Sequence, residues 1–209
     1  EGLVVCSPRL PDEQLHTLLR PHRAVVAINR VIPEALGNSI VPQHSATQMQ
    51  FAHMRAAGYQ RLALLSHSSY SSYDCEAIAT IDAARKAGVL ICHDQGLPTA
   101  EFGYQWLHKC YPALRGQLDG VICSNDLIAH GVLQAAQELG IAVPDEIGVM
   151  GNDDIAASKL IHPALTTLTT PQYAVGRAAM QLLLKDFDDT FEISRPVRFS
   201  PQLVIRESA

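Results

Sequence analysis

Short polar segments follow four of the apolar runs in this sequence, and their side chains could bind a ligand. These segments are residues 29–30, 66–69, 125–126 and 152–154. Amide and hydroxyl groups both donate and accept hydrogen bonds, and carboxylates accept them, which suits a neutral ligand with several hydroxyl groups. Structural roles are open as well. Asn125 or Asp126 could cap a helix, Asp153 or Asp154 could do so in the next loop, and residues 66–69 could form a polar loop.

The common catalytic and metal-binding motifs are missing from the sequence. It contains no GxSxG, GxxxxGK[ST], GxGxxG or HExxH pattern. Five cysteines without a CxxC pair favour neither a disulfide framework nor a zinc site. Cys6, Cys92 and Cys123 lie in or beside apolar runs, so we expect buried thiols there. We therefore expect no enzyme activity, no metal ion and no cofactor.

The composition is that of an ordinary globular chain. Its 209 residues are 47% hydrophobic and 18% charged, and 16 Lys and Arg against 21 Asp and Glu give a net charge of −5. Nucleic-acid affinity depends on clustered Lys and Arg, and no basic block occurs, so direct binding of DNA or RNA by these residues is not expected. No apolar run reaches the roughly 18 residues of a membrane span, and no signal peptide opens the sequence. We expect a cytoplasmic protein without a membrane partner.

Strand and helix patterns alternate along most of the chain. Continuous aliphatic runs predict strands at residues 2–6, 24–28, 39–41, 61–65, 89–92, 120–123 and 147–150. Helices are predicted over residues 46–57 after Ser45, from Asp74 to residue 87, and over residues 127–139. This alternation predicts an α/β fold with parallel sheets. Ligands bind such sheets at the carboxyl ends of the strands, which is where the polar segments would lie.

The last quarter of the sequence departs from this rhythm. A Thr-rich stretch at residues 166–171 ends in proline and is interpreted as an extended connector. A helix is predicted over residues 173–185, and short extended pieces over residues 196–199 and 202–205.

Three ordered motifs resemble the effector-binding core of the lactose/galactose-repressor family. Residues 124–131 (SNDLIAHG) resemble that family's [AS]NDxxAxG, residues 141–154 (IAVPDEIGVMGNDD) resemble xVPxDxxVxGFDD, and residues 163–168 (PALTTL) resemble PxLTT. The likeness extends upstream through residues 25–30 and 57–65, so it covers nearly the whole chain.

The resemblance implies a periplasmic-binding-protein-like fold of two parallel-sheet subdomains with three crossovers and a ligand cleft. The first, N-terminal subdomain would comprise residues 1–43 and 171–200, and the second residues 44–170 and 201–209. Residue 1 would align with the third strand of the family core. The first subdomain would therefore be incomplete, and the DNA-binding head would be absent from this sequence.

The resemblance also implies site residues. Asn29, Asn125 and Asp153 match ligand-contacting positions of the family, and Ser66 joins them as a strand-end candidate. The family's sugar-gripping Arg falls at Ala77, which removes a planar donor group from the expected contacts.

Dimer contacts of the family point to His130, Leu160 and Ile161, although Leu160 and Ile161 could instead belong to the core. The implied function is the effector-sensing and dimerisation core of a bacterial transcriptional regulator, in particular a repressor. It would respond to a sugar, sugar acid or nucleoside, act as a homodimer and reach DNA only through an absent N-terminal helix-turn-helix. The alternatives are a periplasmic sugar-binding protein of an uptake system and an enzyme of the same architecture.

Overall fold

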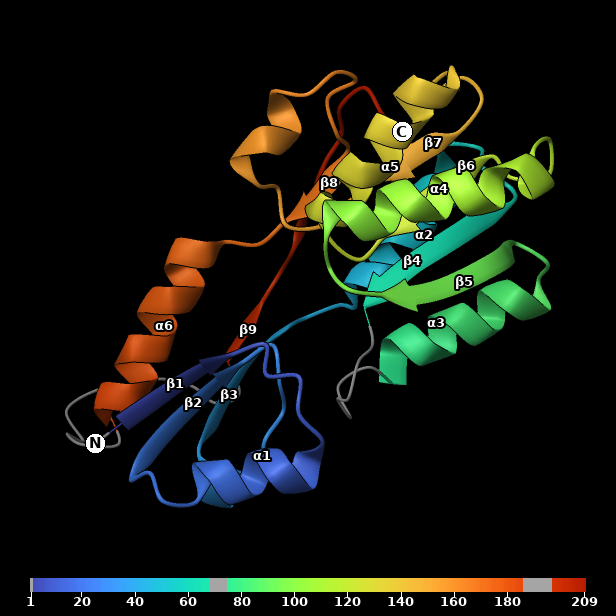
Figure 1. Ribbon diagram of the computed structural model, residues 1–209. Helices are drawn as coiled ribbons and strands as arrows, with labels where there is room; N and C mark the ends of the chain where they lie inside the picture. The colour runs from blue at the N-terminus through green and yellow to red at the C-terminus, as the bar shows by residue number, and fades with distance from the viewer. Residues whose placement is uncertain (1, 68–74, 186–196) are drawn as a thin grey trace. The chain divides into compact units, whose positions relative to one another are not determined.

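The computed structural model describes residues 2–67, 75–185 and 197–209, apart from the side chains of residues 75 and 76. Their contacts divide the chain into two compact units. Unit 1 comprises the described residues of Glu1–His44 and Thr170–Pro201, and unit 2 comprises most of Ser45–Thr169 together with Gln202–Ala209. Each unit is built on a four-stranded parallel sheet (Figure 1).

The sheet of unit 1 is covered by one helix on each face. In sheet order its strands are β1 (Gly2–Cys6), β2 (Ala24–Ile28), β3 (Asn38–Pro42) and β9 (Val197–Phe199). The five residues of β2 are buried, and successive side chains point to opposite faces. Val25 and Ala27 pack with α1 (Asp12–Leu19), whereas Val26 and Ile28 pack with α6 (Gln172–Lys185). A short 3-10 helix, η1 (Glu34–Leu36), precedes β3.

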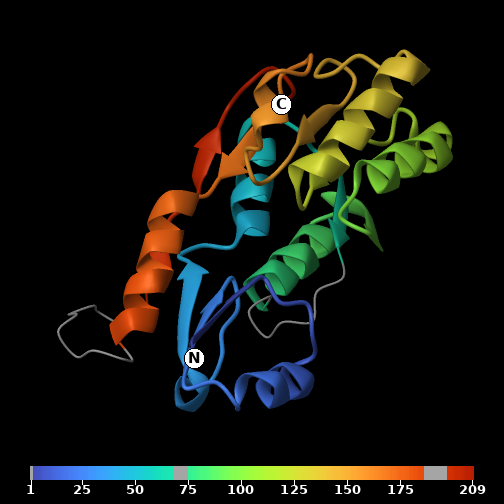
Figure 2. The same cartoon turned by 60° about the vertical axis from the view of Figure 1, so that its left-hand side comes forward.

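Unit 2 has a three-layer core around its own sheet. In sheet order the strands are β5 (Leu90–Gly96), β4 (Leu62–His67), β6 (Gly120–Cys123) and β7 (Gly148–Met150). Helices α4 (Ala100–Leu114) and α5 (Asp126–Leu139) cover one face, and α2 (Ala46–Ala56) and α3 (Cys75–Lys86) cover the other. A 3-10 helix, η3 (Ala156–Lys159), follows β7. The unit is completed by an antiparallel pair, β8 (Thr167–Thr169) with β10 (Gln202–Val204), drawn in orange and red in Figure 2.

The predicted parallel α/β architecture is confirmed, and several local predictions are wrong. Helices α1 and α4 are absent from the sequence-based prediction; α1 has only two buried residues, Leu15 and Leu19, so its apolar pattern is short. Ser45 precedes α2, but its side chain makes no capping hydrogen bond. The Thr-rich stretch is more than a connector, because residues 167–169 pair with β10. Cys6 ends the edge strand β1 and is exposed, not buried. The predicted start of α3 at Asp74 lies outside the described residues.

Candidate functional site

The carboxyl edge of the sheet in unit 2 gathers polar groups from three adjacent strands. His67 ends β4, Ser124 and Asn125 follow β6, and residues 152–154 follow β7 closely. Gln50 in α2 holds two of these strand ends, because its buried Nε2 donates to the carbonyl oxygens of Cys123 and Gly151 at 2.8 Å each. The positions of the polar residues are therefore fixed by the core beneath them.

Asn125 is the N-cap of α5. Its Oδ1 accepts a hydrogen bond from the backbone N–H of Ile128 at 2.9 Å, which satisfies one of the free amides at the start of the helix. Its Nδ2 donates to the carbonyl oxygen of Pro98 at 3.4 Å, a long bond that a ligand oxygen could replace. The capping interpretation is correct for Asn125, and it leaves the amide N–H groups as the part of this side chain suited to a ligand.

The loop after β7 has a backbone that few residues adopt. Asp153 and Asp154 both have positive φ, at 126° and 51°. The backbone N–H of Asp153 donates to Leu168 at 2.8 Å, and one Asp153 carboxylate oxygen accepts from Asn152 Nδ2 at 3.1 Å. Asp154 is engaged elsewhere, because it forms an ion pair of 2.5 Å with Arg206. Of the two carboxylates, Asp153 is therefore the better candidate for a ligand contact.

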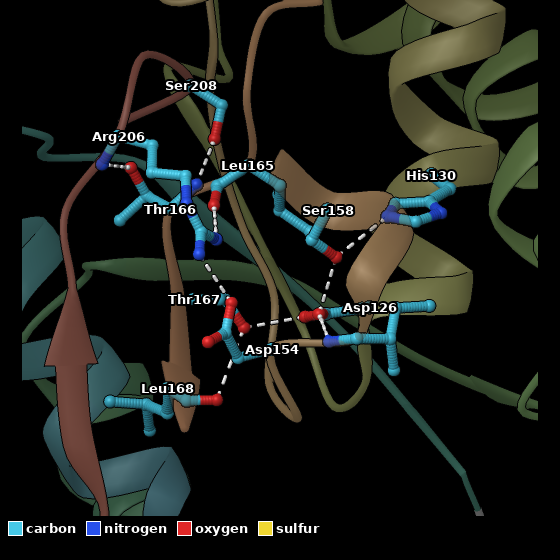
Figure 3. Close-up of polar contacts among 11 residues, drawn as sticks. Asp126, His130, Asp154, Ser158, Leu165, Thr166, Thr167, Leu168, Arg206 and Ser208 are labelled. Atoms are coloured by element: carbon cyan, nitrogen blue, oxygen red, sulfur yellow. Dashed lines mark hydrogen bonds and ion pairs between the residues drawn. The ribbon is translucent and has the colours of Figure 1, made fainter. Parts of the chain in front are cut away.

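Asp126, next to Asn125, is fully buried and accepts three hydrogen bonds in unit 2 (Figure 3). Ser158 Oγ donates to Asp126 Oδ2 at 2.6 Å, and the backbone N–H of Ile155 donates to the same oxygen at 2.9 Å. Thr167 Oγ1 donates to Asp126 Oδ1 at 2.6 Å. Hydrogen bonds of this kind stabilise a buried carboxylate. Asp126 thus has a structural part in the site.

The same corner brings a serine, a histidine and an aspartate together, but not in the order that catalysis needs. His130 Nε2 lies 2.9 Å from Ser158 Oγ, and Ser158 donates its own proton to Asp126. In a hydrolase the histidine lies between the other two and takes the proton from serine. Here the serine is in the middle, it is fully buried, and its proton is committed to the carboxylate. This arrangement does not generate a nucleophile.

Ser66 lies apart from the Asn125 and Asp153 contacts. Its Oγ is 2.8 Å from His93 Nε2 in β5, and His93 Nδ1 is 3.2 Å from Arg85 in α3. Burial, together with the charge of Arg85, lowers the pKa of His93. His67, one residue further along β4, points to the opposite side and meets Ser124: its Nδ1 is 3.1 Å from Ser124 Oγ. The sequence places both residues in the polar segment 66–69, and the prediction singled out Ser66; the alternation of side chains along a strand separates the two.

Asn29 lies at the carboxyl end of β2 in unit 1 and is exposed. It has a positive φ of 57°, and its Nδ2 donates to Ser7 Oγ at 3.1 Å. Arg30, which follows it, is only 1% exposed and donates to the carbonyl oxygens of Pro8 and Leu10 and to Asp12. Arg30 therefore holds the loop between β1 and α1 in place, and Asn29 is the candidate ligand contact at this edge.

The three residues predicted at a dimer surface differ in exposure. Leu160 is 79% exposed, so the core interpretation is wrong for this residue. Ile161 is partly buried and packs against the main core of unit 2. His130 is half-buried beside Ser158, and burial lowers its pKa, while the charge of Asp126 acts in the opposite direction.

The described part of the chain was predicted to hold neither a metal ion nor a membrane span. No group of three or more His, Cys, Asp or Glu side chains lies there in positions that could hold a metal ion. None of the described helices is both long and apolar enough to cross a membrane.

The protein has two parallel α/β units, and each carries polar side chains at the carboxyl ends of its strands. These features are typical of ligand-binding proteins built from two α/β units. The periplasmic binding protein-like domain matches residues 51–209, and the chain belongs to this family. The transcriptional regulator GalS of Salmonella typhimurium is 29% identical, with 99% of this chain and 62% of GalS covered. The regulator GalR of Escherichia coli is 30% identical at the same coverage. The chain thus spans about three fifths of the length of these relatives.

A solved structure supports the same assignment. A sugar-binding transcriptional regulator of the LacI family from Escherichia coli is similar to this chain with a TM-score of 0.80 and 25% identity. The likeness covers 100% of this chain and 76% of that chain. The predicted periplasmic-binding-protein-like fold and the predicted relationship to the lactose/galactose-repressor family are both confirmed. Both of these relatives are named as transcriptional regulators, which favours the first of the three functional interpretations.

Proposed function

We propose that this chain is the effector-sensing core of a bacterial transcriptional regulator of the LacI type. The observation that carries the proposal is the edge of unit 2, where Asn125, Asp153 and His67 come from adjacent strands within a fold shared with sugar-responsive regulators. Amide, carboxylate and imidazole groups together bind a ligand rich in hydroxyl groups. The effector is a sugar or a sugar-like molecule such as a sugar acid or a nucleoside.

Each residue has a defined role in this proposal. Asn125 donates hydrogen bonds from Nδ2 to a ligand hydroxyl group while its Oδ1 still caps α5. Asp153 accepts hydrogen bonds from ligand hydroxyl groups, and its negative charge disfavours anionic groups at that point of the ligand. Asn29 supplies a second amide at the carboxyl end of β2. Ser66 acts indirectly, through its bond to His93.

The wider assignments belong to the same proposal. We assign unit 1 to the N-terminal subdomain and unit 2 to the C-terminal subdomain of such a core. The protein works as a homodimer in the cytoplasm, with Leu160, Ile161 and His130 at the dimer surface. DNA binding is supplied by a helix-turn-helix outside this sequence, and the chain itself is not an enzyme; relatives named as HTH-type transcriptional regulators support both points.

The test is a thermal-shift panel of D-galactose, D-ribose, sucrose, D-galacturonate, sorbitol and adenosine on this chain, followed by variants at Asn125. Asn125→Asp keeps an oxygen that caps α5 but loses the two N–H donors, whereas Asn125→Ala loses both functions. We expect Asn125→Asp to retain the melting temperature and to lose the ligand-induced shift. If a compound shifts the melting temperature equally in the wild type and in Asn125→Asp, the site assignment is wrong. If no compound of the panel shifts it, the proposed ligand class is wrong.

A further inference from the structure

The carboxylate of Asp126 joins three segments of unit 2 that are distant in sequence. It accepts from Ile155 in the loop after β7, from Ser158 in η3 and from Thr167 in β8. Its own backbone N–H donates to the carbonyl oxygen of Asn152 at 2.8 Å. Gly151 allows this approach, because a Cβ at residue 151 would lie 2.3 Å from Asp126 Oδ1. The loop that carries Asp153 is therefore fastened to Asp126 at both ends.

The link continues outward from Ser158 to a more exposed surface. Ser158 donates its proton to Asp126, so it can only accept from His130, and this fixes a proton on His130 Nε2. Figure 3 shows the resulting chain of hydrogen bonds, from His130 through Ser158 to Asp126. Leu160, two residues after Ser158, is exposed. One carboxylate oxygen thus holds both Ile155, two residues after Asp153, and Ser158, which contacts His130.

We propose that Asp126 is a positioning residue that couples the loop carrying Asp153 to His130 and to the segment of residues 158–161, in which Leu160 is exposed. The ligand's part in this coupling rests on the proposed function. A ligand that forms hydrogen bonds with Asp153 displaces Ile155 relative to the Asp126 carboxylate. Ser158 donates to the same carboxylate oxygen and therefore moves with it. Conversely, a partner chain that fixes His130 and Leu160 fixes the loop, because a coupling between two sites acts in both directions.

The link itself is tested without any ligand, by NMR of the isotope-labelled chain. Ser158→Ala removes the outer bond and keeps the bonds of Asp126 to Ile155 and Thr167. We expect the resonances of Asn152 and Asp153 to shift and amide exchange at Ile155 to become about tenfold faster, as the loss of roughly 1.4 kcal/mol predicts. If Ser158→Ala changes only the His130 ring resonances and leaves residues 152–155 as they were, the coupling does not exist.

A second measurement separates positioning from a general loss of stability. Asp126→Asn keeps the shape of the side chain and removes its charge, so the pKa of His130, followed by its ring proton resonance, should fall. Asp119→Asn is the matched control, because Asp119 also accepts backbone N–H bonds, from Gln60 and Arg61, but before β6 at the opposite edge of the sheet. It should leave His130 unchanged. The proposal is overturned if the pKa of His130 is unchanged in Asp126→Asn, or if it falls equally in Asp119→Asn. If Asp126→Asn does not fold, the Ser158→Ala experiment still decides the proposal. The thermal-shift panel reports separately on the proposed function.

Discussion

Gln50 and Gly151 lie 101 residues apart in the sequence and are joined by a buried hydrogen bond of 2.8 Å. The same Nε2 of Gln50 donates to the carbonyl oxygen of Cys123. One amide therefore spans the ends of β6 and β7, the two strands that lead to Asn125 and to Asp153. The spacing between the two candidate ligand residues therefore depends on a buried side chain of α2.

Replacing Gln50 by Leu should destabilise the chain by about 2–6 kcal/mol, because two buried carbonyl oxygens lose their donor at about 1–3 kcal/mol each. Urea unfolding measures the change. Gln48→Leu is the control, since Gln48 lies in the same helix and is exposed, and its change should remain within about 0.5 kcal/mol. If Gln50→Leu and Gln48→Leu change the free energy of unfolding equally, the buried hydrogen bonds of Gln50 make no special contribution to stability.

The sequence was sufficient to predict features that depend on neighbouring residues. The strands at residues 2–6, 24–28 and 120–123 have the predicted bounds, and Gly140 ends α5 in the left-handed conformation. Features that depend on distant pairing could not be predicted. Gln50 looks like any polar residue of an amphipathic helix until Cys123 and Gly151 are placed above it. The choice between Ser66 and His67 likewise required the register of β4 beside β6.

Helices α4 and α5 approach so closely at Gly131 that a side chain there would clash with α4. A Cβ at residue 131 would lie 1.8 Å from the carbonyl oxygen of Ala100, and one at Gly103 would lie 2.1 Å from that of Ile128. Gly131→Ala should therefore force the helices apart and cost about 1–3 kcal/mol in urea unfolding. Gly176→Ala in α6 has open space around its Cβ, and it should raise stability by up to about 1 kcal/mol through helix propensity alone. If Gly131→Ala stabilised the chain, the close packing of α4 against α5 would be contradicted.

The thiols should react with very different rates. Cys6 is exposed, whereas Cys123 is fully buried. Burial and the hydrogen bond to Asp94 raise the pKa of Cys92 to about 12, so almost no reactive thiolate is present at pH 8. Cys110 is partly buried, and burial raises its pKa as well. With Cys75 replaced by Ser, an aromatic disulfide reagent at pH 8 should therefore give one fast-reacting thiol in the folded chain. Cys6→Ser should abolish the fast phase, and a fast phase that persists would place a reactive thiol elsewhere.

His93 should make the chain less stable as the pH falls below neutral. Burial first, and then the charge of Arg85, lower the pKa of His93 in the folded state. In the unfolded chain the pKa returns to about 6.5, so the unfolded state binds the proton more readily. The free energy of unfolding therefore falls as the pH drops through about 6.5, and the loss ends below the folded-state pKa. His93→Gln retains a partner for Ser66 and cannot titrate, so its loss of stability between pH 7 and pH 5 should be smaller than that of the wild type. A His93→Gln variant with the full wild-type loss would show that His93 is as accessible to protons in the folded chain as in the unfolded one.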